Sequence, residues 1–263
     1  MRPKIVVRGL AHEYINPFTQ ERVVALDGVD LEVEEGEFLT VVGPSGCGKT
    51  TLLNILAGLI QPTHGTVLLD GRAVTGPGPD RGVVFQEFAI LPWRTVQRNI
   101  AHGLEIQGVA KAERAAVVRR FVELVGLTGF EKKYPHELSG GMKQRVAVAR
   151  TLAANPHVML MDEPFASVDA QTRITLQEEL NTIAQATRKT ILFVTHNVEE
   201  AVFLGDRCCV LSRRPGKVKA LVPVKIPREH RTWKLFTSDS SFGATKELVL
   251  KLVREEVGRE DTV

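Results

Sequence analysis

The stretch GPSGCGKT, residues 43–50, has the residue types and spacing of a phosphate-binding loop. It matches the pattern G-x-x-x-x-G-K-[ST], in which glycines permit a tight turn and let backbone N–H groups face phosphates. A helix that begins near Lys49 would add the positive end of its dipole. We expect Lys49 to act on the β- and γ-phosphates of a nucleotide and the Thr50 hydroxyl to bind Mg²⁺. The residues expected to contact the nucleotide here are Gly43, Pro44, Ser45, Gly46, Cys47, Gly48, Lys49, Thr50 and Thr51.

Two adjacent carboxylates could supply the acid–base chemistry that accompanies such a loop. Asp162 and Glu163 directly follow the apolar run VMLM, residues 158–161, and directly precede Pro164. We expect Asp162 to hold Mg²⁺, directly or through water, and Glu163 to polarise the attacking water as a general base. The apolar run in front and the proline behind argue against an ordinary pair of surface acids.

Four apolar runs end at residues that could do chemistry. FLTVV (38–42) ends at Gly43, GVVF (82–85) at Gln86, VMLM at Asp162, and ILFVT (191–195) at His196. The runs are continuous, as is typical of strands buried on both faces, and helical patterns separate the first from the second and the third from the fourth. The pattern predicts an α/β fold with a largely parallel sheet, in which ligands bind at the carboxyl ends of the strands. Gln86 is then expected to touch Mg²⁺ or the water, and His196 to join the catalytic group. Taken singly, each also fits a structural role, as a strand-end amide and as a hydrogen-bonded histidine near the core.

The stretch LSGGMKQR, residues 138–145, predicts a second phosphate cradle. Ser139 is a good N-cap, and Gly140 and Gly141 let a ligand approach the backbone at the start of a helix. The strand that carries Asp162 follows this helix at once, so a short connection does not easily bring both cradles onto one phosphate in one subunit. We therefore expect a head-to-tail dimer that ATP closes, with each ATP held between one copy's first cradle and its mate's second. The alternative is an ordinary capped helix.

The composition is that of a folded chain without a strong charge bias. The chain has 263 residues, 43% of them hydrophobic and 25% charged, with a net charge of +3 from 34 basic and 31 acidic residues. These values allow a sizeable core, argue against disorder and do not indicate nucleic-acid binding. Three cysteines make no disulfide framework, which favours a reducing compartment. We expect neither a signal peptide nor a membrane span, so a partner would have to cross any membrane that the protein serves.

Together, GPSGCGKTT, LSGGMKQR, VMLMDEP and the late His196 resemble, in order and spacing, the ATP-binding cassette ATPases over about residues 5–222. The resemblance implies a P-loop NTPase core with a mostly parallel sheet, an antiparallel β region near the N-terminus and a helical subdomain inserted at about residues 89–156. The ATPase domain would span residues 1–222, and residues 223–263 would form a tail with a helix from Lys246 to Glu256. ATP and Mg²⁺ are the implied ligands, and a homodimer, or a pair of like cassettes, would sandwich ATP.

The same resemblance assigns roles to two further segments. Tyr14 resembles the aromatic residue that stacks on adenine, and Phe18 is close enough in sequence to be an alternative. Ser167, Val168 and Asp169 resemble the loop that crosses the dimer interface. The family usually has leucine where this chain has valine, but the aspartate is retained.

A finer resemblance lies in GPGPDRGVVFQEFAILPWRTV, which begins at Gly76. It is similar to the importer ATPases for nitrate, sulfonates and taurine, and a related branch imports pyrimidine precursors of thiamine. Large apolar residues follow Gln86, and soluble monomers seldom expose such groups together. We expect the segment from Gln86 to Trp93 to receive a short helix of an integral membrane permease; the alternative is that it belongs to the core of the inserted lobe. The apolar residues concerned are Phe88, Ile90, Leu91 and Trp93, and helical spacing predicts Val117, Val118, Phe121, Val122 and Val125 as core residues of that lobe.

The expected function is that of the ATP-hydrolysing, energy-coupling subunit of an importer for nitrate, sulfonate or taurine. The resemblance implies a peripheral protein at the cytoplasmic face of the inner membrane, with a solute-binding protein as an indirect partner and no nucleic acid. One alternative is an importer ATPase for another small solute, such as a thiamine pyrimidine precursor. An alternative of another class is a soluble, non-transport cassette protein, but this chain has one cassette and no long heptad run. A half-exporter would usually carry a fused membrane span, and a P-loop kinase would lack LSGG.

Overall fold

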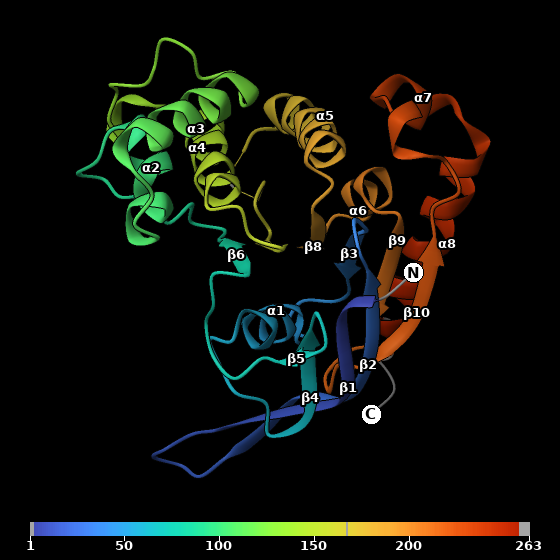
Figure 1. The fold of residues 1–263 in the computed structure, drawn as a ribbon. Helices are drawn as coiled ribbons and strands as arrows, with labels where there is room; N and C mark the ends of the chain where they lie inside the picture. Colours follow the sequence, from blue (N-terminus) through green and yellow to red (C-terminus); the bar gives the residue numbers. More distant parts are fainter. Residues whose placement is uncertain (1–2, 167, 258–263) are drawn as a thin grey trace. The chain divides into compact units, whose positions relative to one another are not determined.

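The chain forms two compact units (Figure 1), one made of residues 1–78 and 184–263 and the other of residues 79–183. The computed structural model describes residues 3–166 and 168–257. The first unit takes in the expected tail, residues 223–263. The second extends beyond the expected insertion at about residues 89–156, because it includes two strands and most of a further helix. No helix within the described ranges is both long and apolar enough to cross a bilayer.

A mainly parallel set of strands forms the core of the first unit. β3 pairs in parallel with β8 on one side and with β9 on the other, and β10 pairs antiparallel with β9. Every residue of β3 and β8 is buried, which confirms the prediction of continuous apolar strands covered on both faces. The bounds are β3 Phe38–Val42, β8 Thr190–Val194, β9 Arg207–Leu211 and β10 Val218–Pro223.

The N-terminal part of this unit is an antiparallel sheet in the order β2-β1-β4-β5, as the family resemblance implied. β1 pairs with β2 and with β4, so that Val7 lies opposite Leu31 on one side and Val67 on the other. Several register shifts interrupt the pairing of β1 with β2. The bounds are β1 Pro3–Ile15, β2 Arg22–Glu34, β4 His64–Leu69 and β5 Arg72–Ala73.

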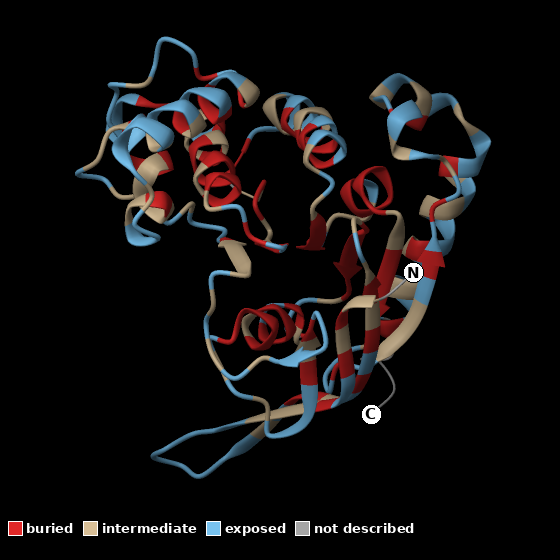
Figure 2. Ribbon diagram, viewed as in Figure 1, coloured by how far each residue is buried: buried red, intermediate tan, exposed pale blue. Residues whose placement is uncertain are grey.

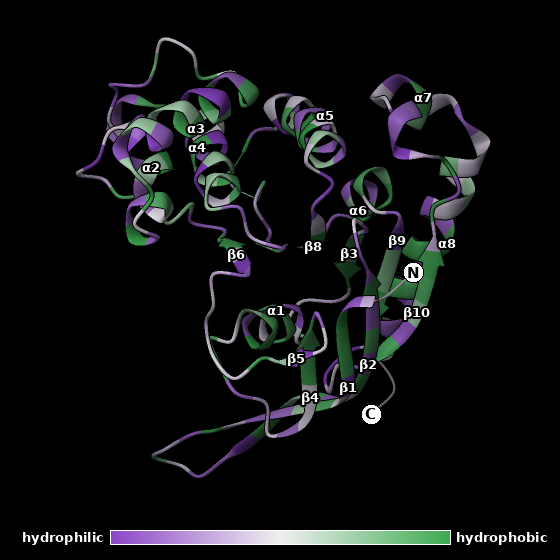
Figure 3. Ribbon diagram, viewed as in Figure 1, coloured by the Kyte–Doolittle hydropathy of each residue, from purple (hydrophilic) through white to green (hydrophobic). Residues whose placement is uncertain are grey.

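Two helices of the first unit follow strands of its parallel core. α1 (Lys49–Ala57) follows β3, and α6 (Val198–Leu204) follows β8. Figure 2 shows α1 as buried along most of its length, and Figure 3 shows it as mostly hydrophobic. A helix buried to this degree holds the loop in front of it in a fixed position.

The C-terminal segment packs onto α6, β9 and β10 of the same unit. The aromatic side chains at this contact pack ring against ring: Trp233 stacks on Phe203 with centroids 4.9 Å apart, and Phe236 meets both rings edge-on. α8 begins six residues before the predicted start at Lys246. The elements are η2 Arg228–His230, α7 Trp233–Ser238 and α8 Ser240–Val257.

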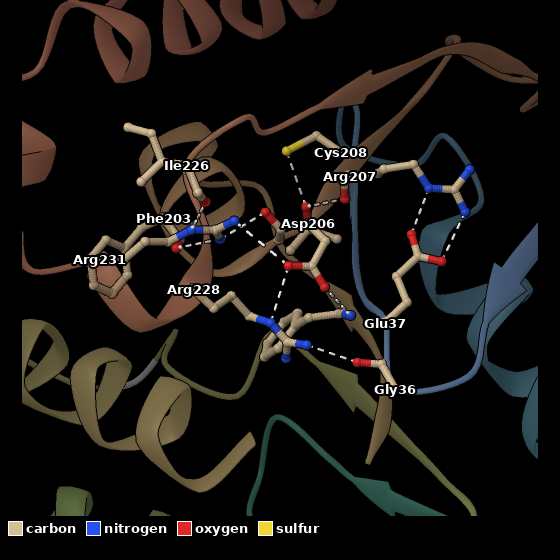
Figure 4. A network of polar contacts seen from close by, with 12 residues as sticks. Gly36, Glu37, Phe203, Asp206, Arg207, Cys208, Ile226, Arg228 and Arg231 are labelled. Atoms are coloured by element: carbon tan, nitrogen blue, oxygen red, sulfur yellow. Dashed lines mark hydrogen bonds and ion pairs between the residues drawn. The ribbon is translucent and has the colours of Figure 1, made fainter. Parts of the chain in front are cut away.

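A buried arginine ties this segment to the strand-and-helix core (Figure 4). The Arg231 guanidinium donates to the carbonyl oxygens of Ile226, Phe203 and Gly205 at 2.8–3.1 Å, and lies 3.6 Å from an Asp206 carboxylate oxygen. Burial lowers the pKa of Arg231 to about 10. Because this value is still well above 7, the group is cationic at neutral pH. A charged side chain with this many partners makes the C-terminal segment part of the unit's core rather than a loose tail.

The second unit combines a parallel strand pair with a group of helices. β6 (Arg81–Val84) pairs with β7 (Val158–Asp162), with Val84 opposite Met161. α2 packs on α3 and α4, and α3 also packs on α4. Val118, Phe121, Val122 and Val125 are buried as predicted, whereas Val117 is half-buried. The helices are α2 Val96–Ile106, α3 Lys111–Leu124, η1 Pro135–Glu137, α4 Gly140–Ala153 and α5 Ala170–Thr187.

Candidate functional site

The glycine-rich loop joins buried β3 to buried α1. Gly48 is the residue before the first turn of α1, and its φ of 101° lies in the left-handed region that side chains disfavour. A Cβ at this position would lie 2.6 Å from the Leu26 Cδ2 atom, so residue 48 has to be glycine. At Gly43 a Cβ would lie 2.8 Å from the Cys47 sulfur. The loop is therefore drawn tightly against its own unit, while its tip at Ser45 and Gly46 is exposed.

The ammonium of Lys49 lies over this loop. Its Nζ donates to the carbonyl oxygens of Gly43 and Pro44, each at 2.9 Å, and the residue is only 7% exposed. Neutral carbonyls satisfy N–H groups without neutralising the charge. A cation held beside the N-terminus of α1 attracts phosphate oxygens. The loop therefore fits the phosphates of a nucleotide.

Tyr14 of β1 contacts the residues that follow this loop. Its hydroxyl lies 3.2 Å from the Thr51 hydroxyl, and its ring, 45% exposed, packs edge-on against His12. Phe18, at the tip of the turn between β1 and β2, is 93% exposed. Of the two candidate adenine-stacking residues, Tyr14 is the one with a contact to the first turn of α1.

His196 stands in a hydrogen-bonded turn between β8 and α6. The Asn197 side chain caps α6 by accepting from Glu199 N and Glu200 N, and Asn197 N donates to the Thr195 hydroxyl. That hydroxyl also donates to the Glu200 carboxylate. His196 itself is exposed, so a turn held by these hydrogen bonds presents its imidazole to solvent.

The parallel pairing of β3 with β8 brings two expected site segments to one sheet edge. Val41 lies opposite Val194, and Thr195 N donates to the Val41 carbonyl at 3.1 Å. The glycine-rich loop and His196 therefore leave the sheet from neighbouring carboxyl ends, where ligands of parallel sheets bind.

The parallel pairing of β6 with β7 brings two further expected site segments to one sheet edge in the second unit. Gln86 follows β6 by two residues and Asp162 ends β7, so the amide and the carboxylates leave neighbouring carboxyl ends. Glu163 has a left-handed backbone with φ 42°, which is uncommon for a residue other than glycine. Buried Pro164 and Phe165 follow it, and such a conformation persists only where the surroundings enforce it.

The LSGG segment presents the N-terminus of α4. The Ser139 hydroxyl accepts from Met142 N at 3.3 Å, and both Ser139 and Gly140 are exposed. Gly141 is buried, and a Cβ there would lie 2.8 Å from the Thr172 methyl group of α5. α4 thus begins with exposed backbone N–H groups, the arrangement that binds anions at helix N-termini.

Asp169 lies close to this segment, because it precedes α5. Its carboxylate accepts from Thr172 N at 3.0 Å, and this backbone hydrogen bond holds the pKa of Asp169 below its ordinary value. Thr172 of α5 therefore contacts Asp169 through its backbone N–H and lies beside Gly141 of the LSGG segment through its methyl group. Ser167, the first residue of the expected interface loop, lies outside the described residues.

Comparison with known proteins decides the family. The family model described as ABC transporter matches residues 26–166. The chain belongs to the ABC transporter family. Two solved structures of a dimeric ATP-binding cassette, one of them described as a post-hydrolysis state bound to ADP and Pi, match with a TM-score of 0.74 and 30% identity, covering 85% of this chain and all of theirs.

Curated relatives of this ABC cassette include several import subunits. An uncharacterised ABC transporter ATP-binding protein of Methanocaldococcus jannaschii is 52% identical over 98% of this chain and 94% of its own length. The nitrate import ATP-binding protein NrtD of Synechocystis is 50% identical over 80% of this chain and 79% of its own. The taurine import ATP-binding protein TauB of Escherichia coli is 46% identical over 88% of this chain and 92% of its own.

Sequence reasoning missed residues that hold the cassette's expected site in shape. Asn197 had a readable signal, since an asparagine before two acidic residues is typical of a helix start. Asn99 and Arg150 hold the segment after Gln86 by hydrogen bonds to its backbone. They had no such signal, because an asparagine inside a helix and an arginine near a helix end usually face solvent.

Proposed function

We propose that this ABC ATPase couples ATP hydrolysis to the import of a small solute of the nitrate and sulfonate class. The observation that carries the proposed mechanism is two separate helix N-termini preceded by glycine-containing turns, one at Gly43 to Thr50 and one at Ser139 to Gly141. The solute class rests on the relatives named for nitrate and taurine import, which are 46–50% identical to this chain.

ATP binding falls to the first cradle. Backbone N–H groups from Gly43 to Thr51 receive the phosphates, and Lys49 exchanges two carbonyl oxygens for phosphate oxygens, which carry more negative charge. Tyr14 stacks on the adenine, a role that its contact with Thr51 supports. The Thr50 hydroxyl, Asp162 and Gln86 would hold Mg²⁺, which would supply charge neutralisation at the phosphates.

Hydrolysis uses the carboxylate and the imidazole at the strand ends. Glu163 accepts the proton of the water that attacks the γ-phosphorus, while Gln86 and His196 position the water and the γ-phosphate. Glu163 has a left-handed backbone that only its surroundings can maintain. This supports the role, because a general base has to be kept in place. Most of the rate enhancement comes from positioning and charge stabilisation.

The second cradle acts on the ATP of another copy. In a head-to-tail homodimer, or a pair of like cassettes, the exposed N–H groups at Ser139 and Gly140 contact the γ-phosphate held by the mate, and Asp169 lies at the interface. The dimeric cassettes that match this chain support the arrangement. Because only ATP offers the γ-phosphate to both copies, ATP closes the dimer and hydrolysis releases it.

The permease docks at the segment from Gln86 to Trp93. Trp93 is 71% exposed and Phe88, Ile90 and Leu91 are half-buried, which favours an interaction surface over the core of the lobe. The subunit would then lie peripherally at the cytoplasmic face of the inner membrane, and a solute-binding protein would act on it only through the permease.

Replacement of Glu163 by glutamine tests the mechanism. The Glu163→Gln chain should bind MgATP, hydrolyse it at least 100-fold more slowly than the parent, which is about the contribution of a general base, and elute as an ATP-dependent dimer. Glu113→Gln, an exposed glutamate on α3, is the matched control and should behave like the parent. Parental turnover by Glu163→Gln would remove this residue from the role of base, and a monomer at saturating MgATP would contradict the shared site.

Uptake of labelled nitrate and labelled taurine tests the solute class. Cells without this gene should lose one of the two uptakes, and the intact chain, but not Lys49→Ala, should restore it. If neither uptake changes, the solute class is wrong and a pyrimidine precursor of thiamine is the next solute to measure. The ATPase mechanism would not be affected, because it depends on other residues.

A further inference from the structure

The segment after β6 turns through two consecutive residues with left-handed backbone, Phe88 at φ 59° and Ala89 at φ 47°. Residues other than glycine rarely adopt this conformation, and two in succession persist only where neighbouring groups hold them. Local hydrogen bonds close the turn, from Phe88 N to the Phe85 carbonyl and from Ala89 N to the Glu87 carbonyl. The turn starts two residues after Gln86, so it governs the direction in which the chain leaves that amide.

Arg150 of α4 holds this turn from a distant part of the sequence. Its guanidinium donates from Nη1 to the Ala89 carbonyl at 2.7 Å and from Nη2 to the Phe88 carbonyl at 3.5 Å. A planar guanidinium donates to two carbonyl oxygens from two nitrogens held in a fixed fork, whereas a lysine has a single nitrogen on a flexible stem. Burial lowers the pKa of Arg150, as expected for a cation enclosed by backbone.

The other end of the segment is held by α2. The buried Asn99 amide accepts from Leu91 N at 2.8 Å and donates to the carbonyl oxygens of Leu91, Arg94 and Thr95 at 2.9–3.1 Å. α2 in turn packs on α4. Residues 88–95 are thus fastened at both ends to the helices of their own unit.

α4 is the helix whose first turn carries the LSGG cradle. It runs without a break from Gly140 to Ala153, and its interior residues are almost all buried, including Val146 and Ala149. A single straight helix in a packed core moves as one body. A displacement applied at Arg150 therefore reaches Ser139 and Gly140 at the other end of the same helix.

We propose that Arg150 is a positioning residue that couples the segment at 88–95 to the LSGG cradle. The inference rests on the proposed function, in which this segment docks the permease and the cradle contacts the mate's ATP. Movement of the docked permease shifts the turn, the guanidinium passes the shift to α4, and the cradle approaches or leaves the γ-phosphate. The same link works in reverse, so that closure of the dimer on ATP changes the docking segment.

Trp93 provides an intrinsic probe for the test, because it lies in the segment and is 71% exposed. The background chain carries Glu163→Gln, to trap the ATP-bound dimer, and Trp233→Phe, to leave Trp93 as the remaining tryptophan of the 2 in the sequence. Acrylamide quenching of Trp93 is measured with and without MgATP, and dimer formation is followed in the same samples by sedimentation. Closure on ATP should change the quenching constant in the background chain.

Arg150→Lys keeps the positive charge but loses the paired hydrogen bonds from two nitrogens to the Phe88 and Ala89 carbonyl oxygens. It should dimerise with MgATP as the background does, yet lose the ATP-dependent change in Trp93 quenching. Arg119→Lys, an exposed arginine on α3, is the matched control and should keep the change. If Arg150→Lys does not fold, Ala89→Val carries the test. A β-branched residue resists the left-handed φ of this position, so the substitution displaces the turn without touching α4 and should also lose the change.

The outcomes separate the coupling from the function on which it rests. A background chain that stays monomeric with MgATP contradicts the proposed function, and the coupling falls with it. A background dimer without any change at Trp93 overturns the coupling alone. An Arg150→Lys dimer that responds as the background does also overturns the coupling. Where the lysine variant does not fold, the same response from an Ala89→Val dimer overturns it. Because dimer formation is measured in the same sample, a merely destabilised protein cannot give the expected result.

Discussion

Ser139 has two roles that a pair of substitutions can separate. In the described structure its hydroxyl caps α4 by accepting from Met142 N. Under the proposed function, the same hydroxyl also donates a hydrogen bond to the γ-phosphate held by the mate, beside the backbone N–H groups. Ser139→Ala removes both interactions, whereas Ser139→Asn keeps a capping oxygen but puts a larger side chain where the phosphate has to approach. Ser139→Ala should therefore be less stable than Ser139→Asn, whereas both variants should lose ATP hydrolysis.

The magnitudes follow from the geometry. Replacing an N-cap serine by alanine costs about 0.5–2 kcal/mol, and the long 3.3 Å bond at Ser139 puts this site near the lower end. Asparagine ranks with serine as an N-cap, so Ser139→Asn should leave the free energy of unfolding close to that of the parent. A hydrogen bond to a charged group is worth about 1.5–3 kcal/mol, so loss of the contact should slow hydrolysis by about 10- to 150-fold in both variants.

Urea unfolding followed by circular dichroism gives the stabilities, and phosphate release at saturating MgATP gives the rates. Mixing either Ser139 variant with Lys49→Ala chains should restore part of the activity, because one intact composite site forms in the mixed dimer. Parental hydrolysis by Ser139→Asn would refute the reasoning, since the residue would then be a cap and nothing more. Failure to restore activity at every mixing ratio would weaken the shared-site argument.

Three further predictions address the adenine contact, the buried thiols and the C-terminal segment. Tyr14→Ala should raise the Kd for ATP by about 5- to 150-fold, since stacking of a base on an aromatic ring is worth about 1–3 kcal/mol; Phe18→Ala should leave it unchanged, and titration with a fluorescent nucleotide compares them. Burial raises the pKa of Cys208 from 9 to about 11, so its contribution to stability is complete below pH 9 and is lost as the pH rises toward 11. Between pH 8 and pH 11, the free energy of unfolding measured in urea should fall by about 2 kcal/mol less in Cys208→Ala than in the parent. Arg231→Ala should lower the free energy of unfolding by about 2–6 kcal/mol, because it leaves two buried carbonyl oxygens, those of Phe203 and Gly205, without their donor, at about 1–3 kcal/mol each. A loss below 1 kcal/mol would show that the C-terminal segment is not part of the core.

The strands that carry the chemistry were predictable because they are buried on both faces. A strand such as β3, with every residue buried, has to be apolar throughout, so FLTVV is visible without any periodicity. β6 and β8 were each expected one residue late, and β7 extends one residue further, to Asp162. The turn from β3 into α1 was predictable for a related reason, since the residues that mark it, Gly43 to Thr50, are eight consecutive ones.

The division of the chain into two units could not be predicted from apolar runs in this way. The C-terminal segment joins the first unit through the stacking of Trp233 on Phe203 and through Arg231, which are contacts across about 30 positions of sequence with no repeating pattern. The long strands β1 and β2 were equally hard to predict, since several register shifts break the alternation that marks a half-buried strand. Tertiary partners decide such features, and one sequence does not reveal its tertiary partners.

The expected nucleotide-site residues divide between the two units, and this division bears on how hydrolysis is controlled. Lys49 and His196 belong to one unit, whereas Gln86, Glu163 and Ser139 belong to the other. Phosphoryl transfer depends almost entirely on positioning and on charge placed in advance. Under the proposed function, hydrolysis therefore requires Lys49 and Glu163 to act on one phosphate at the same time. For a subunit that couples hydrolysis to transport, this requirement would let a permease at the proposed docking segment, residues 86–93, control when ATP is hydrolysed.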